Sequence, residues 1–317
     1  MISNLLTDTI MGDQTAVHID NLDLYLTQIG KIFDIQRIIN EPQGKPQIIN
    51  YYHKNAFLIY RLFHNWEGFM HCGISYDGKN KKDDFKEQAK IVESYIHESN
   101  AKNVLELAYG WGANSAFLAK RNPEVTFEAI DLSLTPLKRF TKIQNLRFQS
   151  GDYHDLSAFK DDLYDVVFVI EALCCSTNKS QVLSEVKKKL RRGGLFIVVD
   201  AYRRDCANPM YQSEDVMAKL IEKGFSVDEF ECIKDVESYM QEVYSITKAK
   251  DFTQCVLPCM AKGKWVRYYF SHPTFARVFN KLLPFDMVKN TIVALLIEIS
   301  IRRQIACYYL HVLKNDK

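Results

Sequence analysis

A glycine-punctuated turn between an apolar run and a helical stretch constrains this chain more than any other feature. Residues 104–109 are mainly apolar, Gly110 and Gly112 follow, and residues 115–120 have a helical pattern that stops before Pro123. This order predicts a buried strand, a tight turn and a helix. Glycines let a ligand lie against bare main chain, and the free N–H groups at a helix start attract an anion. By itself such a turn indicates either a binding loop or a plain tight turn.

More predicted strands follow, and acidic residues accompany them. Glu106 lies in the first strand, Asp131 ends the run 125–131 about 25 residues later, and Asp152 closes the next short run. A fourth strand is predicted at 164–170, apolar throughout its middle as is typical of a central parallel strand. The carboxyl ends of parallel strands form the ligand crevice of an open sheet, so Asp131 is a candidate for binding the hydroxyls of a ribose.

These motifs, in this order and spacing, resemble the class I S-adenosylmethionine-dependent methyltransferases. The resemblance covers residues 100–235 and rests on Glu106-x-Ala108-x-Gly110-x-Gly112, Ile130-Asp131-Leu132-Ser133, Gly151-Asp152, Tyr164 to Ile170 and Arg192-Gly193-Gly194-Leu195. It implies an α/β fold: a Rossmann-like, doubly wound sheet of seven strands whose last strand is antiparallel, with N-terminal helices and a helical lid inserted before that strand. Ala108 departs from the family, which usually has glycine there, and its methyl group narrows the turn.

The resemblance also implies S-adenosyl-L-methionine as the cofactor, with S-adenosyl-L-homocysteine as its product. Gly110 and Gly112 would pass along the methionine end, Asp131 would hold the ribose, and Asp152 with Tyr153 would meet the adenine. The full set of expected cofactor-binding residues is Tyr52, Glu106, Ala108, Gly110, Gly112, Asp131, Leu132, Asp152, Tyr153 and Glu171. NAD-binding proteins share the glycine turn, but the Gly151-Asp152 and Arg192-Gly193-Gly194 elements do not belong to their pattern.

Two pieces upstream are similar to elements of small-molecule methyltransferases that alkylate carbon, of the sterol, tocopherol and prenyl-diphosphate groups. They are Tyr51-Tyr52, in an aromatic-rich stretch at 47–70, and Met70-His71-Cys72-Gly73. By this resemblance they would cap the sulfonium pocket, where an aromatic face stabilises a cation by about 0.5 to 2 kcal/mol. The rings could equally pack into a core, and His71 could be structural rather than catalytic. Tyr51 and Tyr60 are candidates for substrate binding.

The segment after the fourth strand, Glu171-Ala172-Leu173-Cys174-Cys175-Ser176, bears on the chemistry. It contains neither Asn/Asp-Pro-Pro-Tyr nor a Pro-Cys pair, so we do not expect methylation of nucleic acid. Glu171 matches the glutamate of carbon-methylating enzymes that act on alkenes, where a carboxylate can stabilise a carbocation and remove a proton. Glu171 could instead hydrogen-bond the backbone at the strand end. Cys174 and Tyr202 are further candidates for substrate contact, although Cys174 could be a small buried residue and Tyr202 could belong to a solvated loop.

The other elements are predicted from apolar periodicity. We expect helices at 19–39, 85–97, 181–190 and 216–223, a fifth strand at 195–199 with a loop at 200–204, a sixth strand at 226–233, a helical insertion at 236–303 and a last strand at 306–313. The apolar run 292–297 is too short to cross a bilayer, which needs about 20 residues. The insertion is basic as well as apolar from 262 to 303, so it could line a pocket or rest on a membrane surface.

The composition is that of a soluble enzyme. With 47% hydrophobic residues the chain can bury a sizeable core, and a net charge of +2 indicates no nucleic-acid partner. The eight cysteines lack zinc-site spacing, so we expect reduced thiols, no metal and a cytoplasmic location. Residues 1–19 lack the basic start and apolar core of a signal peptide.

The sequence therefore predicts a methyltransferase acting on a small, largely apolar acceptor, with carbon favoured and Glu171 and His71 as catalytic candidates. The predicted division is a helical cap at 1–100, a cofactor-binding core at 101–235, a lid at 236–303 and the final strand of the core at 304–317. Three alternatives remain open: oxygen or nitrogen methylation of a natural-product intermediate, a non-catalytic protein that binds the cofactor, and a peripheral membrane enzyme. Self-association into a homo-oligomer is also left open.

Overall fold

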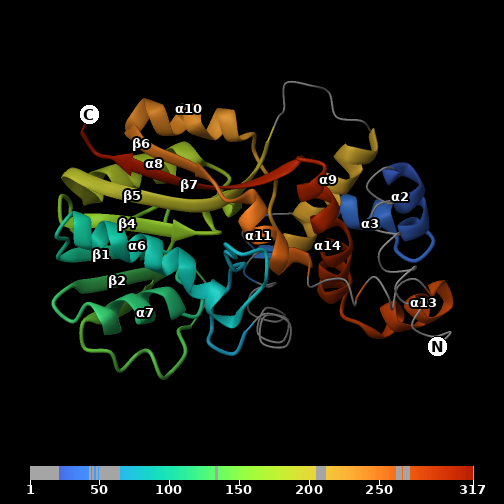
Figure 1. Cartoon of the computed structure of the whole chain (residues 1–317), viewed down its shortest axis with the longest axis horizontal. Helices are drawn as coiled ribbons and strands as arrows, with labels where there is room; N and C mark the ends of the chain where they lie inside the picture. Colours follow the sequence, from blue (N-terminus) through green and yellow to red (C-terminus); the bar gives the residue numbers. More distant parts are fainter. Residues whose placement is uncertain are drawn as a thin grey trace.

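The chain folds around a sheet of seven strands in the order β3-β2-β1-β4-β5-β7-β6 (Figure 1). The computed structural model describes residues 21–42, 44, 46–47, 49, 65–132, 135–204, 212–261, 266 and 272–316. The strands are β1 (Asn103–Leu107), β2 (Thr126–Asp131), β3 (Leu146–Ser150), β4 (Tyr164–Ile170), β5 (Leu190–Arg203), β6 (Ser245–Asp251) and β7 (Ala306–Lys314). β1 to β5 pair in parallel, whereas β7 runs antiparallel to both β5 and β6. The predicted doubly wound sheet with an antiparallel last strand is confirmed.

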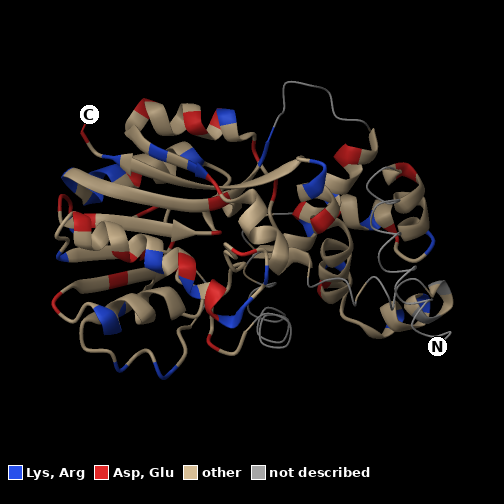
Figure 2. Ribbon diagram, viewed as in Figure 1, with Lys and Arg blue, Asp and Glu red and all other residues tan. Residues whose placement is uncertain are grey.

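Helices cover both faces of the sheet because alternate strand residues point to opposite sides. Val104, Phe127 and Val166 belong to one core, together with apolar residues of α6 (Glu87–Glu98) and α7 (Ala113–Arg121). Leu105 and Val167 belong to the other core, with α8 (Lys179–Lys189) and α10 (Ile233–Val243). Acidic and basic residues are interspersed over the described elements, a pattern typical of a solvated surface (Figure 2).

The predicted sixth strand was wrong. Residues 226–233 contain only an isolated bridge at Cys232, and Ile233 already begins α10. The edge strand is instead β6, whose residues from Thr247 to Asp251 are exposed and, apart from Ala249, polar. An edge strand that faces solvent lacks the apolar alternation on which the prediction relied. The helical insertion therefore begins after Asp251.

Other elements also differ in extent from the prediction, and three of them have a local explanation or a consequence for the fold. The helix expected at 19–39 is two helices, α2 (Leu22–Gly30) and α3 (Ile35–Ile39), because the Asp34 side chain caps a new start. The helix expected from 85 is preceded by a 3₁₀ turn, η2 (Lys82–Lys86). β5 continues through the loop expected at 200–204 as far as Arg203, which pairs with Ala306 of β7. This pairing with β7 could not be read from the local residues.

Beyond the carboxyl ends of the strands lies a helical layer (Figure 1). It comprises α9 (Gln212–Phe225), α11 (Thr253–Met260), α13 (Pro273–Leu282) and α14 (Phe285–Arg302), with α2 and α3 at its outer side. Where α14 packs against α9, a Cβ on Gly224 would lie 2.1 Å from Val293 Cγ2. The division into cap, core and lid stays a prediction.

Among the helices of the described ranges, we find none with the length and apolar character that a bilayer crossing requires.

Gly224→Ala is expected to lower the free energy of unfolding by about 1 to 3 kcal/mol, because the added methyl group overpacks the contact between α9 and α14. The backbone oxygen of Lys289, 2.9 Å from the built Cβ, leaves little room for relaxation. Gly30→Ala is the matched control, since its Cβ would meet nothing closer than 3.5 Å. Urea denaturation of both variants measures the difference, and equal stabilities would contradict this account of the packing.

Candidate functional site

The turn after β1 can be formed only with very small residues at two positions. Gly110 and Gly112 have φ of 58° and 82°, in the region that favours glycine. A Cβ on Gly110 would lie 2.8 Å from Met70 Sδ, and one on Gly112 would lie 2.7 Å from the Phe148 ring. Ala108 also has a positive φ, 55°. An L-residue in this conformation costs about 1 to 2 kcal/mol, so the departure from glycine is tolerated with strain.

Glu106 is buried beneath this turn. Its carboxylate accepts hydrogen bonds from the backbone N–H and hydroxyl of Ser115, and Asn114 Nδ2 lies 3.4 Å from Oε1. Burial raises the pKa of the Glu106 carboxyl to about 7, although the bonds from Ser115 and Asn114 act in the opposite direction. Asn114 Oδ1 is also 3.1 Å from His71 Nε2. Glu106 is thereby linked to the segment before the core.

Asp131, at the end of β2, accepts a hydrogen bond of 2.9 Å from the backbone N–H of Gly110. This contact joins the second strand end to the glycine turn, as parallel neighbours permit. Leu132 follows Asp131 directly, and Asp131 itself is 8% exposed. The carboxylate therefore stands at the rim of the turn where the ligand crevice is expected.

A third carboxylate is held by a histidine that the sequence analysis missed. His154 approaches Asp152 Oδ1 with Nδ1 at 2.7 Å, and its Nε2 lies 2.7 Å from the Ser176 hydroxyl. Tyr153 donates from its hydroxyl to the Ala172 carbonyl. The loop after β3 is thus tied to the segment after β4, which no local pattern around residues 152–154 indicates.

Glu171 is the point where three segments meet. Its Oε1 accepts from the Cys72 backbone N–H at 2.9 Å, from the Cys72 thiol at 2.7 Å and from the Tyr308 hydroxyl at 2.8 Å. Gln88 Nε2 also donates to the Cys72 carbonyl and the Tyr308 hydroxyl. Burial, and secondarily the charge of Glu171, raises the pKa of the Cys72 thiol, which therefore remains a protonated donor. Glu171 has a φ of 50°, an uncommon conformation that places its side chain at the end of β4.

His71 does not reach this meeting point with its ring. Nδ1 lies 3.0 Å from the Cys72 carbonyl oxygen, Nε2 faces Asn114, and the residue is only 3% exposed. The ring packs edge-on against Phe69. His71 is therefore buried among protein groups. Its ring contacts Asn114 in α7, the helix that follows β1, and the carbonyl oxygen of Cys72, whose backbone N–H binds Glu171.

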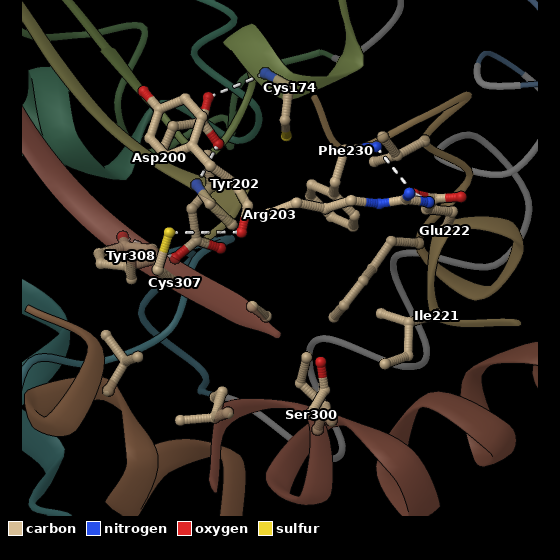
Figure 3. Close-up of a pocket in the computed structure, with 18 of the residues that line it drawn as sticks. Cys174, Asp200, Tyr202, Arg203, Ile221, Glu222, Phe230, Ser300, Cys307 and Tyr308 are labelled. Atoms are coloured by element: carbon tan, nitrogen blue, oxygen red, sulfur yellow. Dashed lines mark hydrogen bonds and ion pairs between the residues drawn. The ribbon is translucent and has the colours of Figure 1, made fainter. Parts of the chain in front are cut away.

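Next to Glu171 lies a cavity between the sheet and the helical layer (Figure 3). Its wall is mostly apolar and includes Ile221, Phe225, Phe230, Val256, Met260, Ile297 and Ile301 from α9, α11, α14 and a connecting segment. Cys174, Tyr202 and Tyr308 also line it, as does Asp200. Asp200 is fully buried, and burial raises the pKa of its carboxyl to about 6.

The structure brings some expected residues together and separates others. Glu171, Cys174 and Tyr202 line the cavity, whereas Glu106, Asp131 and Asp152 do not; these three acids lie at or near the carboxyl ends of β1, β2 and β3. Tyr51, Tyr52 and Tyr60 lie outside the described residues. Tyr308, Asp200 and His154 were not among the predicted site residues; Asp200 could have been found because it directly follows the apolar run 195–199. Within the described ranges, no three His, Cys, Asp or Glu residues form a group that could hold a metal ion.

The comparison with protein families agrees with this arrangement. Residues 105–198 match the family model described as a methyltransferase domain. We refer to this matched segment as the methyltransferase domain. It includes the glycine turn, Asp131, Asp152 and Glu171, which surround the candidate site.

Curated relatives of the methyltransferase domain resemble it over part of their length. The chain is 32% identical over 106 residues to a phthiotriol/phenolphthiotriol dimycocerosates methyltransferase of Mycobacterium ulcerans, covering 32% of this chain and 39% of that protein. It is 33% identical over 106 residues to a fatty-acid O-methyltransferase of Mycolicibacterium smegmatis, covering 32% and 38%. The chain thus spans about two fifths of the length of these relatives.

Solved structures resemble nearly the whole chain. The cyclopropane synthase of Mycobacterium tuberculosis superposes with a TM-score of 0.64 at 13% identity, covering 87% of this chain and 100% of that one. The geranyl diphosphate C-methyltransferase of Streptomyces coelicolor gives 0.58 at 13% identity, covering 87% and 100%. At these identities the likeness shows the fold alone.

The raised pKa of Glu106 predicts a pH dependence of stability. Between pH 4.5 and about 7 the folded protein keeps a proton on Glu106 that the unfolded chain has lost, so stability falls as pH rises through this window. Glu106→Gln removes the effect. As pH rises from 5 to 7.5, the free energy of unfolding of the variant should increase by about 2 to 3 kcal/mol relative to that of the wild type. If urea denaturation shows the same change of stability with pH in the wild type and in the variant, the prediction is contradicted. Asp200 is present in both proteins, so its titration contributes equally to both profiles.

Proposed function

We propose that this protein is an S-adenosylmethionine-dependent methyltransferase that acts on a small, largely apolar acceptor. The proposal rests on one observation above all: in a segment that matches a methyltransferase domain, the end of β4 meets a mostly apolar cavity that Glu171 lines. Such a cavity, with few polar groups in an apolar wall, is typical of small-molecule sites.

The residues around the glycine turn fit the proposed cofactor. Gly110 and Gly112 leave bare main chain where side chains would collide, and Glu106, Asp131 and Asp152 supply acceptors in the order of the strands. We assign Glu106, Ala108, Gly110 and Gly112 to the methionine end, Asp131 and Leu132 to the ribose, and Asp152 and Tyr153 to the adenine. The bound cofactor supplies an electrophilic methyl group. Tyr52 remains a candidate outside the described residues.

Glu171 is the proposed catalytic residue. Cys72 and Tyr308 direct three hydrogen bonds to its Oε1, so this oxygen is fixed, and Glu171 is one of the residues that line the cavity. An alkene that gains a methyl group develops positive charge, which the carboxylate can stabilise before it removes a proton. The apolar wall excludes water and aligns the acceptor, which supplies much of the rate gain.

We assign His71 a positioning role. One ring nitrogen of His71 is within hydrogen-bond distance of Asn114, which lies next to Glu106. The other is within hydrogen-bond distance of the Cys72 carbonyl oxygen, and the N–H and thiol of Cys72 hold Glu171. Cys174 and Tyr202 are proposed to contact the acceptor from the cavity wall, whereas Tyr51 and Tyr60 stay predictions. Oxygen or nitrogen methylation is the alternative chemistry; there a lone pair takes the methyl group directly, so no carbocation forms that Glu171 would have to stabilise. A protein that binds the cofactor without turnover is the non-catalytic alternative.

The cofactor assignment is tested by calorimetric titration with S-adenosylhomocysteine. We expect micromolar binding by the wild type, and binding weaker by about 1 to 3 kcal/mol in Asp131→Ala, the loss usual for a charged hydrogen-bond partner. Asp161→Ala is the control, because this 65%-exposed residue precedes β4 at the opposite edge of the sheet. If the wild type fails to bind, the enzyme proposal has to be abandoned.

The role of Glu171 is tested by transfer of a labelled methyl group to a panel of apolar alkenes, alcohols and carboxylic acids. Glu171→Gln should lower kcat by about 100-fold or more on an alkene, the range usual for a lost general base. Tyr308→Phe keeps the carboxylate and removes one donor, so it should lower kcat by about tenfold or less. Unchanged turnover of Glu171→Gln would favour oxygen or nitrogen methylation.

A peripheral contact with a membrane is a second proposal, supported by α13. Val278, Phe279 and Leu282 on this helix are 58%, 41% and 77% exposed, and Arg277 and Lys281 accompany them. An amphipathic helix of this kind can lie at an anionic membrane surface. We expect the protein to sediment with phosphatidylglycerol vesicles at low salt and Leu282→Glu to reduce the bound fraction. No sedimentation of the wild type would refute the contact.

A further inference from the structure

The cavity beside Glu171 has polar groups on two sides with apolar walls between them. Figure 3 shows Asp200 and Tyr308 on one side and Glu222 on the opposite side, with Arg203 reaching toward Glu222. Arg203 comes from the end of β5 and Glu222 from α9, and both line the cavity. Asp200 and Tyr308 belong to the side on which Glu171 is held. The second polar side, the Arg203–Glu222 pair, has no part in the proposed chemistry.

Glu222 is buried and Arg203 is half-buried, and among the described residues their hydrogen-bonding capacity is only partly used. The two side chains are 16% and 4% exposed, and Arg203 Nη2 donates to Glu222 Oε1 at 2.9 Å. The same oxygen accepts the Phe230 backbone N–H at 2.9 Å. A guanidinium has five donors and a carboxylate about four acceptor sites. The two hydrogen bonds described here both go to Glu222 Oε1, so they use only a small part of this capacity. Within the part of the chain that the structure describes, the buried Nε of Arg203 has no hydrogen-bond partner.

Stability alone does not account for such a pair in an apolar wall. Replacing a buried ion pair by apolar residues of similar volume is often neutral or stabilising, because desolvation of both charges is costly. In small-molecule sites, by contrast, a few polar groups in an apolar wall fix the orientation of the ligand. The pair is therefore a candidate for a specificity determinant.

The charge of the pair limits what it can bind. Arg203 and Glu222 neutralise one another, so an ionised ligand group would bring an uncompensated charge into the apolar cavity. A neutral hydroxyl adds no charge, and it can accept from the guanidinium while donating to the carboxylate. An ether oxygen can accept a hydrogen bond but cannot donate one, and an alkyl end can do neither.

We infer that the acceptor is an apolar molecule bearing a neutral hydroxyl group remote from the methylated atom, and that the Arg203–Glu222 pair binds this hydroxyl. The inference rests on the proposed function, since it takes the cavity as the acceptor site. It assigns the far side of the cavity to recognition and leaves the Glu171 side to the reaction.

The test uses three probes of similar size: 1-octanol, its isomer heptyl methyl ether, and octanoate. Calorimetry with the full chain and saturating S-adenosylhomocysteine should show that the wild type binds 1-octanol about tenfold more tightly than the ether, the effect of one satisfied buried hydrogen bond. Octanoate should bind more weakly than 1-octanol. Octanoate as the tightest ligand would overturn the inference, because the pair would then select an anion.

Paired substitutions locate the preference. Removing one partner strands a buried charge, so the main variant combines Arg203→Met with Glu222→Met and should bind 1-octanol and the ether within about threefold of one another. The control variant combines Arg204→Met with Asp251→Asn and removes a neighbouring ion pair, in which Arg204 Nη2 and Asp251 Oδ2 are 2.8 Å apart. Neither residue lines the cavity. This control should keep the tenfold preference.

The outcomes separate this inference from the proposed function. Failure of the wild type to bind S-adenosylhomocysteine would refute the proposed function. Two other results would refute the inference alone. One is binding of S-adenosylhomocysteine without any preference for 1-octanol, and the other is a preference that survives when Arg203→Met and Glu222→Met are combined.

Discussion

The hydrogen bonds to Glu171 join the three parts of the chain that make the site. Cys72 precedes the methyltransferase domain, Glu171 ends β4 and Tyr308 lies on the last strand, so residues more than two hundred positions apart meet at one carboxylate oxygen. Charge-assisted hydrogen bonds of this kind are about twice as strong as neutral ones. Because the three donors converge on one oxygen, the N-terminal segment and β7 are held where they close one side of the cavity.

Carboxyl groups recur in positions where ionisation is costly. Burial raises the pKa of Glu106 to about 7 and that of Asp200 to about 6, and it also raises the pKa of Glu222 despite the nearby Arg203. Buried acids with shifted pKa values tend to gather at functional sites, although structural networks can have the same effect. Here they stand along the carboxyl ends of parallel strands and on the helix that faces them, which is where an α/β sheet offers room for a ligand.

Much of the sheet could be predicted because its central strands carry local signals. β4 begins and ends at the predicted residues, and β2 begins one residue later than predicted and ends at Asp131 as predicted. The edge strand β6 was missed because its polar, solvent-facing side chains lack alternation. In the candidate site, the positions of Glu106, Asp131 and Asp152 at strand ends and the family resemblance of Glu171 made these residues candidates from the sequence. Tyr308 and His154 could not, since their partners lie in other segments.

The sequence alone determined the strand–turn–helix order, the acidic strand ends and the need for glycine at two positions, because these depend on local backbone geometry and apolar periodicity. Only the tertiary structure decided which distant side chains hold those acids. The pairing of β5 with β7 places Tyr308 at Glu171, and the packing of α9 and α14 beyond the sheet places Glu222 at Arg203 in the cavity wall. Such contacts arise from the way the helices and strands pack. The residues that make them cannot be recognised from the amino acids next to them in the sequence.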